Sequence, residues 1–328
     1  MVTGYDVIGD VHGSATKLAG LLDVLGWTAG ADGRRRHPDG DRTVVFVGDL
    51  IDRGDEQRAV LELVRAMVDA GDAQIVMGNH ELNALAWATP NPDRPGRFLR
   101  GHTAKNRRQH AAFLTQLDDD ERASWLAWFR TLPLWLDLGG LRVVHACWHT
   151  DAMAVVQEEV GGARFPDGPD GDALLQRALT PGTPLFRAVE ILCKGPEIDL
   201  RRYGLPPYRD KGGHTRHVAR VRWWTAEPTS VRDVVDIPQG TTTLDGAPYP
   251  DLPDVPCLEA DRRHCYTDDV PVVYGHHWRR WEPEHGMDWT PRTACVDFSA
   301  VVGGPLVAYR FEGEPFVDPT HYERYPSA

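Results

Sequence analysis

The sequence has few lysines, and its excess of acidic residues excludes one class of partner. Only four of the 36 basic residues are lysines, and 48 acidic residues leave a formal net charge of −12. Non-specific binding to nucleic acids or anionic membranes depends on clustered basic side chains. We therefore expect no stable nucleic-acid binding.

Cysteines and long apolar runs are also scarce. The five cysteines are odd in number and form no C-x-x-C pair, which fits reduced thiols better than a disulfide framework. No run of about 18 apolar residues could span a bilayer. The opening residues, MVTGYDVIGD, lack the basic and apolar regions of a secretory signal. The sequence therefore predicts a cytoplasmic protein without a membrane segment.

Strands and helices are expected to alternate in the first part of the chain. Apolar spacing predicts strands at 5–9, 43–47 and 74–77, and helices at 14–26, at 55–70 and from Asn79. Such alternation favours a largely parallel sheet covered on both faces, and ligands of these sheets gather at the carboxyl ends of the strands.

The later chain is expected to return to the same core. Further helices are predicted at 108–117, 121–132, 173–179 and 185–192, and a hairpin turning at Gly139 and Gly140 carries His145. Strands follow at VPVVYGHHW, TACVDFSA and PLVAYRFEG. We therefore predict a single domain over 1–328 with a specificity insertion at 151–270.

Four short strings each follow an apolar strand and begin with glycine. They are GDVHG at 9–13, GDLIDRG at 48–54, GNHE at 78–81 and GHH at 275–277. Glycine lets the backbone turn sharply, so the following side chains can meet in one crevice. Carboxylate, imidazole and amide oxygen together form a ligand set for divalent ions such as Mn, Fe, Ni or Zn.

In combination, these strings resemble the calcineurin-like metallophosphoesterases. The branch in question contains the Ser/Thr phosphoprotein phosphatases, the phage-type phosphatases and the symmetrical diadenosine tetraphosphatases. The matching residues are Asp10, His12, Asp49, Asp52, Arg53, Asn79, His80, His145 in VVHA and His276 in YGH. The resemblance covers roughly half the chain and implies an α/β fold, a sandwich of two mixed β-sheets flanked by helices.

This resemblance implies two divalent metal ions, with Mn²⁺ expected and Fe, Ni or Zn as alternatives. Asp10 and His12 would bind one ion, and the second would be bound by Asn79, His145 and His276. Asp49 would bridge them at a separation of about 3.5 to 4 Å. The implied mechanism is direct attack on phosphorus by a hydroxide shared by the two ions.

Four of the matching residues are expected to take part in catalysis or substrate binding. Asp52 would accept a hydrogen bond from His80 and keep that imidazole protonated as a general acid. Arg53 would clamp the phosphate oxygens, and Asn79 would also contact the substrate.

The sequence departs from the family pattern at two positions. Many relatives have a second histidine where this chain has Trp278, and Ser299 stands where glycine is usual. We expect His277 to lie beside the ligands and to support them, and the alternative is that it takes the place of the missing histidine.

A basic patch lies within the expected insertion. Its members are Arg201, Arg202, Arg209, Lys211, Arg216, Arg220 and Arg222. Arg220 and Arg222 would share one face of a strand as substrate ligands, with Trp223 and Trp224 on opposite faces. For the tryptophans, packing in the core is favoured over stacking on a nucleotide base. Pairing of the arginines with local acids is an equally favoured interpretation.

The sequence therefore predicts a metal-dependent phosphoric ester hydrolase with an anionic phosphorylated substrate. Phosphate monoesters, on a phosphoprotein or a small metabolite, are the first expectation. The alternative is a symmetrical dinucleoside polyphosphate hydrolase acting on diadenosine tetraphosphate. A catalytically silent binding protein is disfavoured, because all the expected ligands are present.

Overall fold

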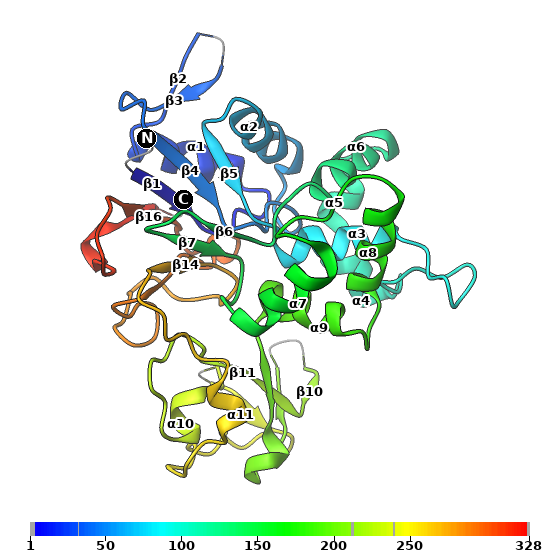
Figure 1. Ribbon diagram of the computed structural model, residues 1–328, viewed down its shortest axis with the longest axis vertical. Coiled ribbons are helices and arrows are strands. Elements are labelled where there is room, and N and C mark those ends of the chain that lie inside the picture. Colours follow the sequence, from blue (N-terminus) through cyan, green and yellow to red (C-terminus); the bar gives the residue numbers. More distant parts are fainter. Residues whose placement is uncertain (1–3, 32, 211–212, 239, 327–328) are drawn as a thin grey trace. The chain divides into compact units, whose positions relative to one another are not determined.

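The apolar run that opens the chain forms the middle strand of a five-stranded sheet in the computed structural model (Figure 1). β1 (Gly4–Ile8), β4 (Arg42–Phe46) and β5 (Ala73–Ile75) run parallel, as the alternation of strands and helices predicts. β16 (Leu306–Phe311) and β17 (Tyr322–Tyr325) extend the sheet in antiparallel directions, in the order β17-β16-β1-β4-β5. The structure describes residues 4–31, 33–210, 213–238 and 240–326.

A second, four-stranded sheet has the order β15-β14-β7-β6. β15 (Thr293–Cys295), β14 (Val272–Tyr274) and β7 (Arg142–Val144) run parallel, and β6 (Trp135–Asp137) forms the predicted hairpin with β7. The late strands therefore return to the core, as expected from the sequence.

The two sheets share one hydrophobic core. It contains Val7, Val45, Val47, Val76, Leu141, Val143, Val273, Ala294, Val296, Tyr309, Phe311 and Val317. These side chains come from both sheets, so burial of the inner faces holds the layers together. The expected α/β fold with two mixed sheets flanked by helices is confirmed.

The strands of each sheet end in register. Ile8 pairs with Phe46, which pairs with Ile75, and Tyr274 pairs with both Val144 and Cys295. Parallel strands that end together place the loops that follow them at one edge of the sheet. The glycine-led strings that follow strands of the same sheet therefore begin side by side at that edge.

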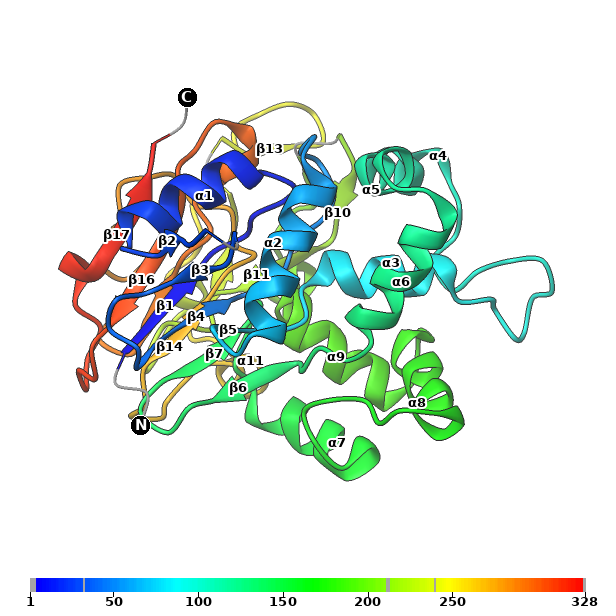
Figure 2. The same ribbon diagram turned by 90° about the horizontal axis from the view of Figure 1, so that it is seen from above.

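Two helices pack against the first sheet. α1 (Ala15–Val24) contacts β16 and β17, and α2 (Gln57–Asp69) contacts β5 (Figure 2). Leu18, Leu21 and Leu22 of α1 are buried, which explains the helical spacing of leucines in this segment.

Seven further helices form a group beside the sheets (Figure 2). They are α3 (Asn79–Ala88), α4 (Ala104–Gln109), α5 (Ala111–Gln116), α6 (Asp119–Phe129), α7 (Thr150–Val160), α8 (Pro169–Leu179) and α9 (Pro184–Lys194). Two findings differ from the expectations: the predicted helix at 108–117 is interrupted at His110, and α7 was not predicted. The remaining short elements of this part are β2 (Thr28–Ala29), β3 (Arg35–Arg36), η2 (Ala300–Val302) and η3 (Pro319–His321).

The chain divides into two compact units. The first comprises 1–194 and 269–328, and the second comprises 195–268. α7, α8 and α9 therefore belong to the first unit, although the sequence analysis placed the start of the insertion at 151. The single domain with an insertion stays a prediction.

The second unit consists of short strands and helical turns. One sheet contains β8 (Glu197–Asp199), β11 (Val218–Val221) and β12 (Val235–Asp236), and another contains β9 (Tyr208–Arg209), β10 (Thr215–Arg216) and β13 (Thr242–Thr243). η1 (Leu200–Tyr203), α10 (Val231–Val234) and α11 (Glu259–Arg262) complete it.

The predicted strand through the basic patch is shorter than expected. β11 ends at Val221, so Arg222 and the tryptophans follow it instead of continuing its alternation. Trp223 and Trp224 are both buried, which confirms the expectation that these rings pack in the core.

Local acids pair with most of the arginines of the basic patch. Arg201 pairs with Asp199, Arg202 with Asp261, Arg216 with Asp210 and Arg222 with Asp236. Lys211 lies outside the described residues. Of the two interpretations weighed from the sequence, these ion pairs favour neutralisation within the unit.

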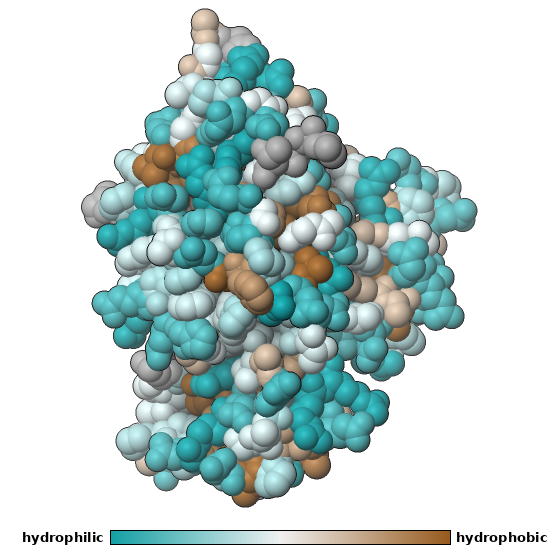
Figure 3. All heavy atoms as spheres, turned by 60° about the vertical axis from the view of Figure 1, so that its left-hand side comes forward, coloured by the Kyte–Doolittle hydropathy of each residue, from teal (hydrophilic) through white to brown (hydrophobic). Residues whose placement is uncertain are grey.

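Among the described residues, no helix combines the length and apolar character needed to cross a bilayer. On the face shown in Figure 3, hydrophobic side chains occur in small separate groups among hydrophilic ones.

Gly9 offers a test of how closely the two sheets approach each other. A Cβ at this position would lie 2.0 Å from the carbonyl oxygen of Val296, which follows β15. We expect Gly9→Ala to reduce the free energy of unfolding by about 1 to 3 kcal/mol or more, because backbone on both sides must shift. Urea unfolding followed by circular dichroism measures this.

Gly140→Ala is the matched control, since its Cβ would meet only Phe311 at 3.8 Å. Its unfolding free energy should stay within about 0.5 kcal/mol of the wild type. Equal stability of the two variants would contradict the close approach at Gly9.

Candidate metal centre

The loops formed by the glycine-led strings have unusual backbone conformations. Positive φ angles occur at His12 (47°), Asp49 (53°), Asp52 (71°), Arg53 (69°) and His276 (68°). Left-handed backbone costs non-glycine residues on the order of 1 to 3 kcal/mol each and persists only where surrounding contacts hold it. Such strain, concentrated in one set of loops, indicates that the fold holds these side chains in particular directions for a function.

Asp49 lies at the centre of the site and is 2% exposed. Its Oδ1 accepts a hydrogen bond from the backbone N–H of His80 at 2.9 Å and lies 3.4 Å from His145 Nε2. Its Oδ2 lies 3.6 Å from His12 Nε2 and 3.9 Å from His80 Nε2. One carboxylate therefore faces three imidazoles that come from three separate segments of the chain, with His80 in the first turn of α3.

Two groups of side chains place their donor atoms within 4.8 Å of one another. One contains His12, Asp49 and His80, and the other contains Asp49, His145 and His276. Asp49 belongs to both groups, which is the arrangement that a bridging ligand requires.

The hydrogen bonds of His12 and His145 determine which ring nitrogen faces the site. His12 Nδ1 lies 2.8 Å from the Ile51 carbonyl oxygen, and His145 Nδ1 lies 2.7 Å from that of Val47. A carbonyl oxygen only accepts, so both Nδ1 atoms carry the proton and the Nε2 lone pairs point toward Asp49. Burial, above all, lowers the pKa of His12 to about 3, which keeps this imidazole neutral.

These lone pairs face other acceptors, which suits a cation. His12 Nε2 is buried without a hydrogen-bond partner, and His145 Nε2 lies 3.1 Å from Asn79 Oδ1. Neutral nitrogen and oxygen acceptors repel one another at such distances unless a cation lies among them. The donor set therefore fits divalent metal ions.

Asp10 lies at the edge of this set. Its carboxylate accepts hydrogen bonds from the backbone N–H of His276 at 3.2 and 3.3 Å, but it belongs to neither group of three. Burial, followed by the charges of Asp297 and Asp49, raises the pKa of Asp10 well above its ordinary value. A nearby cation would relieve this accumulation of buried negative charge.

Asp297 is a residue that sequence reasoning missed. It is 3% exposed, and its carboxylate accepts hydrogen bonds from the backbone N–H groups of Trp278 and Ser299 at 2.9 and 3.0 Å. The available signal was its position directly after an apolar strand in CVDFSA, the same context as Asp10 and Asp49. Asp297 thus connects the two positions at which the chain departs from the family pattern.

Glu81, also missed, joins three parts of the site. Its carboxylate accepts hydrogen bonds from the backbone N–H groups of Asp49 (2.8 Å), Leu50 (2.8 Å) and Gly78 (3.1 Å). Burial and then the charge of Asp49 raise the pKa of Glu81 to about 7. The side chain thereby holds the strained turn at Asp49 against the start of α3.

Asp52 and His80 form the expected pair. His80 Nδ1 lies 2.5 Å from Asp52 Oδ2, and both residues are buried. Burial opposes ionisation of Asp52, but hydrogen bonds from His110 and His80 outweigh it and lower the pKa of Asp52. Burial likewise lowers the pKa of His80, but Asp49 and Asp52 outweigh it, so this pKa is raised overall.

Arg53 lies at the exposed edge of the site. Its guanidinium carbon lies 4.2 Å from the centroid of the Trp278 ring, so the departure at Trp278 provides a surface for this arginine. His277 is buried, and its Nε2 lies 3.0 Å from the Ala146 carbonyl oxygen. Arg220 and Arg222 lie in the second unit, and their role as substrate ligands stays a prediction.

Comparison with known proteins assigns the family. The model of the calcineurin-like phosphoesterases matches residues 5–182. The chain belongs to this family. It is therefore a phosphoric ester hydrolase of the metallophosphoesterase type, and the donor set above provides candidate ligands for the divalent ions that this family requires.

Relatives of this metallophosphoesterase include two named tetraphosphatases. The asymmetrical bis(5'-nucleosyl)-tetraphosphatase PrpE of Bacillus subtilis (strain 168) is 32% identical and covers 50% of this chain and 69% of its own. The symmetrical bis(5'-nucleosyl)-tetraphosphatase of Janthinobacterium sp. (strain Marseille) is 32% identical and covers 92% of this chain and 90% of its own. The solved structure of a protein serine/threonine phosphatase from Saccharomyces cerevisiae is 14% identical, with a TM-score of 0.46. That match covers 100% of this chain and 81% of the yeast chain.

The central position of Asp49 predicts a loss of metal in Asp49→Asn. We expect the purified wild type, dialysed after loading with Mn²⁺, to retain about two ions per chain, and Asp49→Asn to retain fewer than about one. The amide lacks the charge that a bridging ligand contributes. Inductively coupled plasma mass spectrometry measures the content.

Asp55 is exposed and lies near Asp49 in the sequence, so Asp55→Asn is the control. This variant should retain as much metal as the wild type. Undiminished binding by Asp49→Asn would contradict the bridging position.

Proposed function

We propose that this metallophosphoesterase hydrolyses its substrate at two divalent ions, with Mn²⁺ as the working metal. The observation that carries the proposal is the Asp49 carboxylate, which lies within 4 Å of His12, His80 and His145 beside the His80–Asp52 pair. Asp10 and His12 would hold one ion, Asn79, His145 and His276 the other, and Asp49 both. When bound, the ions would supply an activated water and withdraw charge from the phosphoryl oxygens.

His80 is proposed to donate a proton to the leaving oxygen. Its Nδ1 is held by Asp52 at 2.5 Å, which fixes the ring and leaves Nε2 on the side of Asp49. Against the effect of burial, Asp49 and Asp52 raise the pKa of His80, which favours the protonated ring that a general acid requires. Arg53, exposed on Trp278, would bind phosphate oxygens, and Asn79 would contact the substrate from the start of α3.

We propose a dinucleoside polyphosphate as the substrate. A relative named as a symmetrical tetraphosphatase matches 92% of the chain, well beyond the residues that the family model covers. In symmetrical hydrolysis of diadenosine tetraphosphate, water adds its oxygen to one middle phosphorus and the bridging oxygen leaves with the other, which yields two ADP molecules. A phosphate monoester is the second candidate, because a firmly held general acid suits an alkoxide leaving group.

We also propose that the protein works in the cytoplasm. The five cysteines occur as thiols, which fits a reducing compartment. Cell fractionation with an antibody tests this, and recovery of the protein outside the cytoplasmic fraction would contradict it.

The products identify the substrate class. With Mn²⁺ and diadenosine tetraphosphate, we expect ADP as the sole nucleotide product, without free phosphate, measured by anion-exchange chromatography. AMP and ATP would indicate asymmetrical cleavage. Phosphopeptide hydrolysis with a kcat/KM at least about tenfold higher, equivalent to about 1.4 kcal/mol, would favour the monoester. Asp49→Asn is the control for contaminating phosphatases.

The acid role of His80 predicts a dependence on the leaving group. His80→Ala should lower kcat by about 10²- to 10⁴-fold on an alkyl phosphate, whose alkoxide needs a proton. The loss should be much smaller on p-nitrophenyl phosphate, whose leaving group is stable as an anion. Steady-state kinetics on both substrates measure this, and equal losses would count against proton donation by His80.

A further inference from the structure

The Asp52 carboxylate is held by two histidines, and only one of them belongs to the expected pair. Oδ2 lies 2.5 Å from His80 Nδ1, and Oδ1 lies 2.7 Å from His110 Nδ1. Asp52 is 2% exposed, His110 3% and His80 8%. A buried carboxylate with a donor on each oxygen cannot rotate without breaking a hydrogen bond where water does not replace it.

His110 is itself held in place by surrounding rings. It lies where α4 ends and α5 begins, and its ring stacks on Phe113 with centroids 4.9 Å apart and an interplanar angle of 24°. On another side it packs against Trp87, with centroids 5.7 Å apart. Trp87 belongs to α3, the helix that begins with Asn79 and His80. The ring of His110 is therefore fixed relative to the helix that carries the acid.

The contacts around Trp87 continue away from the site. His102 stacks on Trp87 at 3.7 Å and 18°, and Phe98 stacks on His102 at 4.3 Å and 12°. Arg100 donates hydrogen bonds to Asn83 of α3 and to Gln109 of α4 at 2.7 and 2.9 Å. These contacts connect α3 to α4 and restrict movement of His110.

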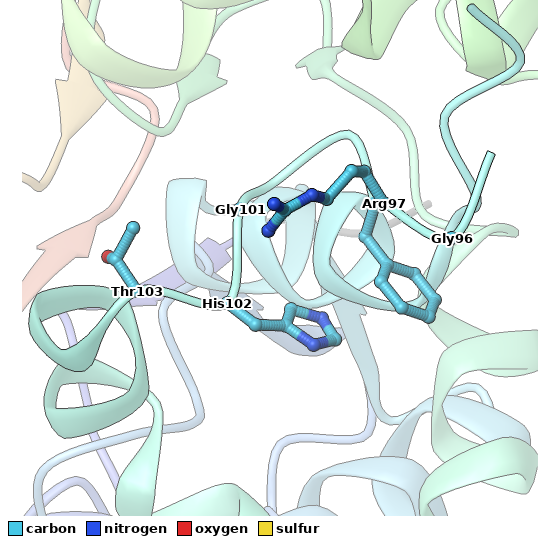
Figure 4. A pocket seen from close by; sticks show the side chains of 6 residues that line it. Gly96, Arg97, Gly101, His102 and Thr103 are labelled. Carbon is cyan, nitrogen blue, oxygen red and sulfur yellow. The ribbon is translucent and has the colours of Figure 1, made fainter. Parts of the chain in front are cut away.

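The loop that carries His102 also lines a hollow of about 240 Å³ (Figure 4). Figure 4 shows Arg97 and His102 on this loop. His102 differs from His110 in its hydrogen bond. Its Nε2 lies 2.9 Å from the Trp87 carbonyl oxygen, and among the contacts described it makes no hydrogen bond to Asp52. His102 is therefore a matched control, since it packs on the same tryptophan.

We propose that His110 is a positioning residue that fixes the Asp52 carboxylate so that His80 is aimed at the leaving oxygen. This inference rests on the proposed function, because it concerns the proton donor of that reaction. His110 acts through Asp52 and touches neither substrate nor metal. The role depends on the Nδ1–H group of His110, so another side chain that places an N–H at the same point should restore the function of His110.

Kinetics of His110 variants test the proposal. We expect His110→Ala to lower kcat on an alkyl phosphate by about 10- to 100-fold, with KM within about twofold, and to change kcat on p-nitrophenyl phosphate by less than about threefold. His110→Asn, whose amide N–H can occupy the place of Nδ1–H, should recover most of the loss. His102→Ala should leave the ratio of the two rates unchanged.

A purely structural role would give a different pattern. It would lower both rates together in His110→Ala and leave their ratio at the wild-type value. Equal losses on both substrates, or a full loss in His110→Asn, would overturn the positioning role. If wild type with added metal hydrolyses neither these phosphate monoesters nor diadenosine tetraphosphate, the proposed function itself has failed.

A spectroscopic measurement keeps the test decisive even if His110→Ala does not fold. In ¹⁵N-histidine-labelled protein with Mg²⁺, the Nδ1–H protons of both His80 and His110 should give downfield, exchange-protected signals. In His110→Asn one signal should disappear and the signal of His80 should shift, because its acceptor has lost its original partner. An unshifted His80 signal would overturn the coupling through Asp52.

Discussion

The site depends on one electrostatic constraint: buried carboxylates and imidazole nitrogens lie close together around Asp49, where they repel one another. Asp10, Asp49 and Asp297 are nearly inaccessible to water, and His12 and His145 direct their Nε2 atoms toward the same region. Placing these groups together is unfavourable without a cation. A divalent ion placed among these groups would offset that cost, so the arrangement suits metal binding.

Holding such an arrangement requires support from the backbone. Positive φ angles at His12, Asp49 and His276 carry strain that the surrounding contacts must balance. Glu81 contributes three hydrogen bonds to backbone N–H groups, and the two sheets approach closely enough at Gly9 to exclude a methyl group. The hydrophobic core of the sandwich thus supplies the rigidity on which the polar site depends.

The groups with proposed roles in the reaction differ in how firmly they are held. Asp52, His80 and His110 form a buried chain packed by Phe113 and Trp87. Arg53, by contrast, is exposed and rests on Trp278. A proton donor needs a fixed direction, whereas a phosphate clamp must admit and release its ligand, so the difference fits the two proposed roles. In the second unit, local ion pairs hold most arginines of the basic patch.

The sequence by itself determined the features that depend on neighbours along the chain. Apolar spacing predicted α1, α2 and the parallel strands, and the glycine-led strings indicated the side chains around Asp49, because turn chemistry and periodicity are local. Glu81, Asp297 and His110 were missed, and the break in the helix at His110 was unexpected. Only tertiary structure decided these features: His110, for example, contacts Asp52 across 58 positions. Local pattern cannot report such contacts, since their energy comes from groups brought together only by folding.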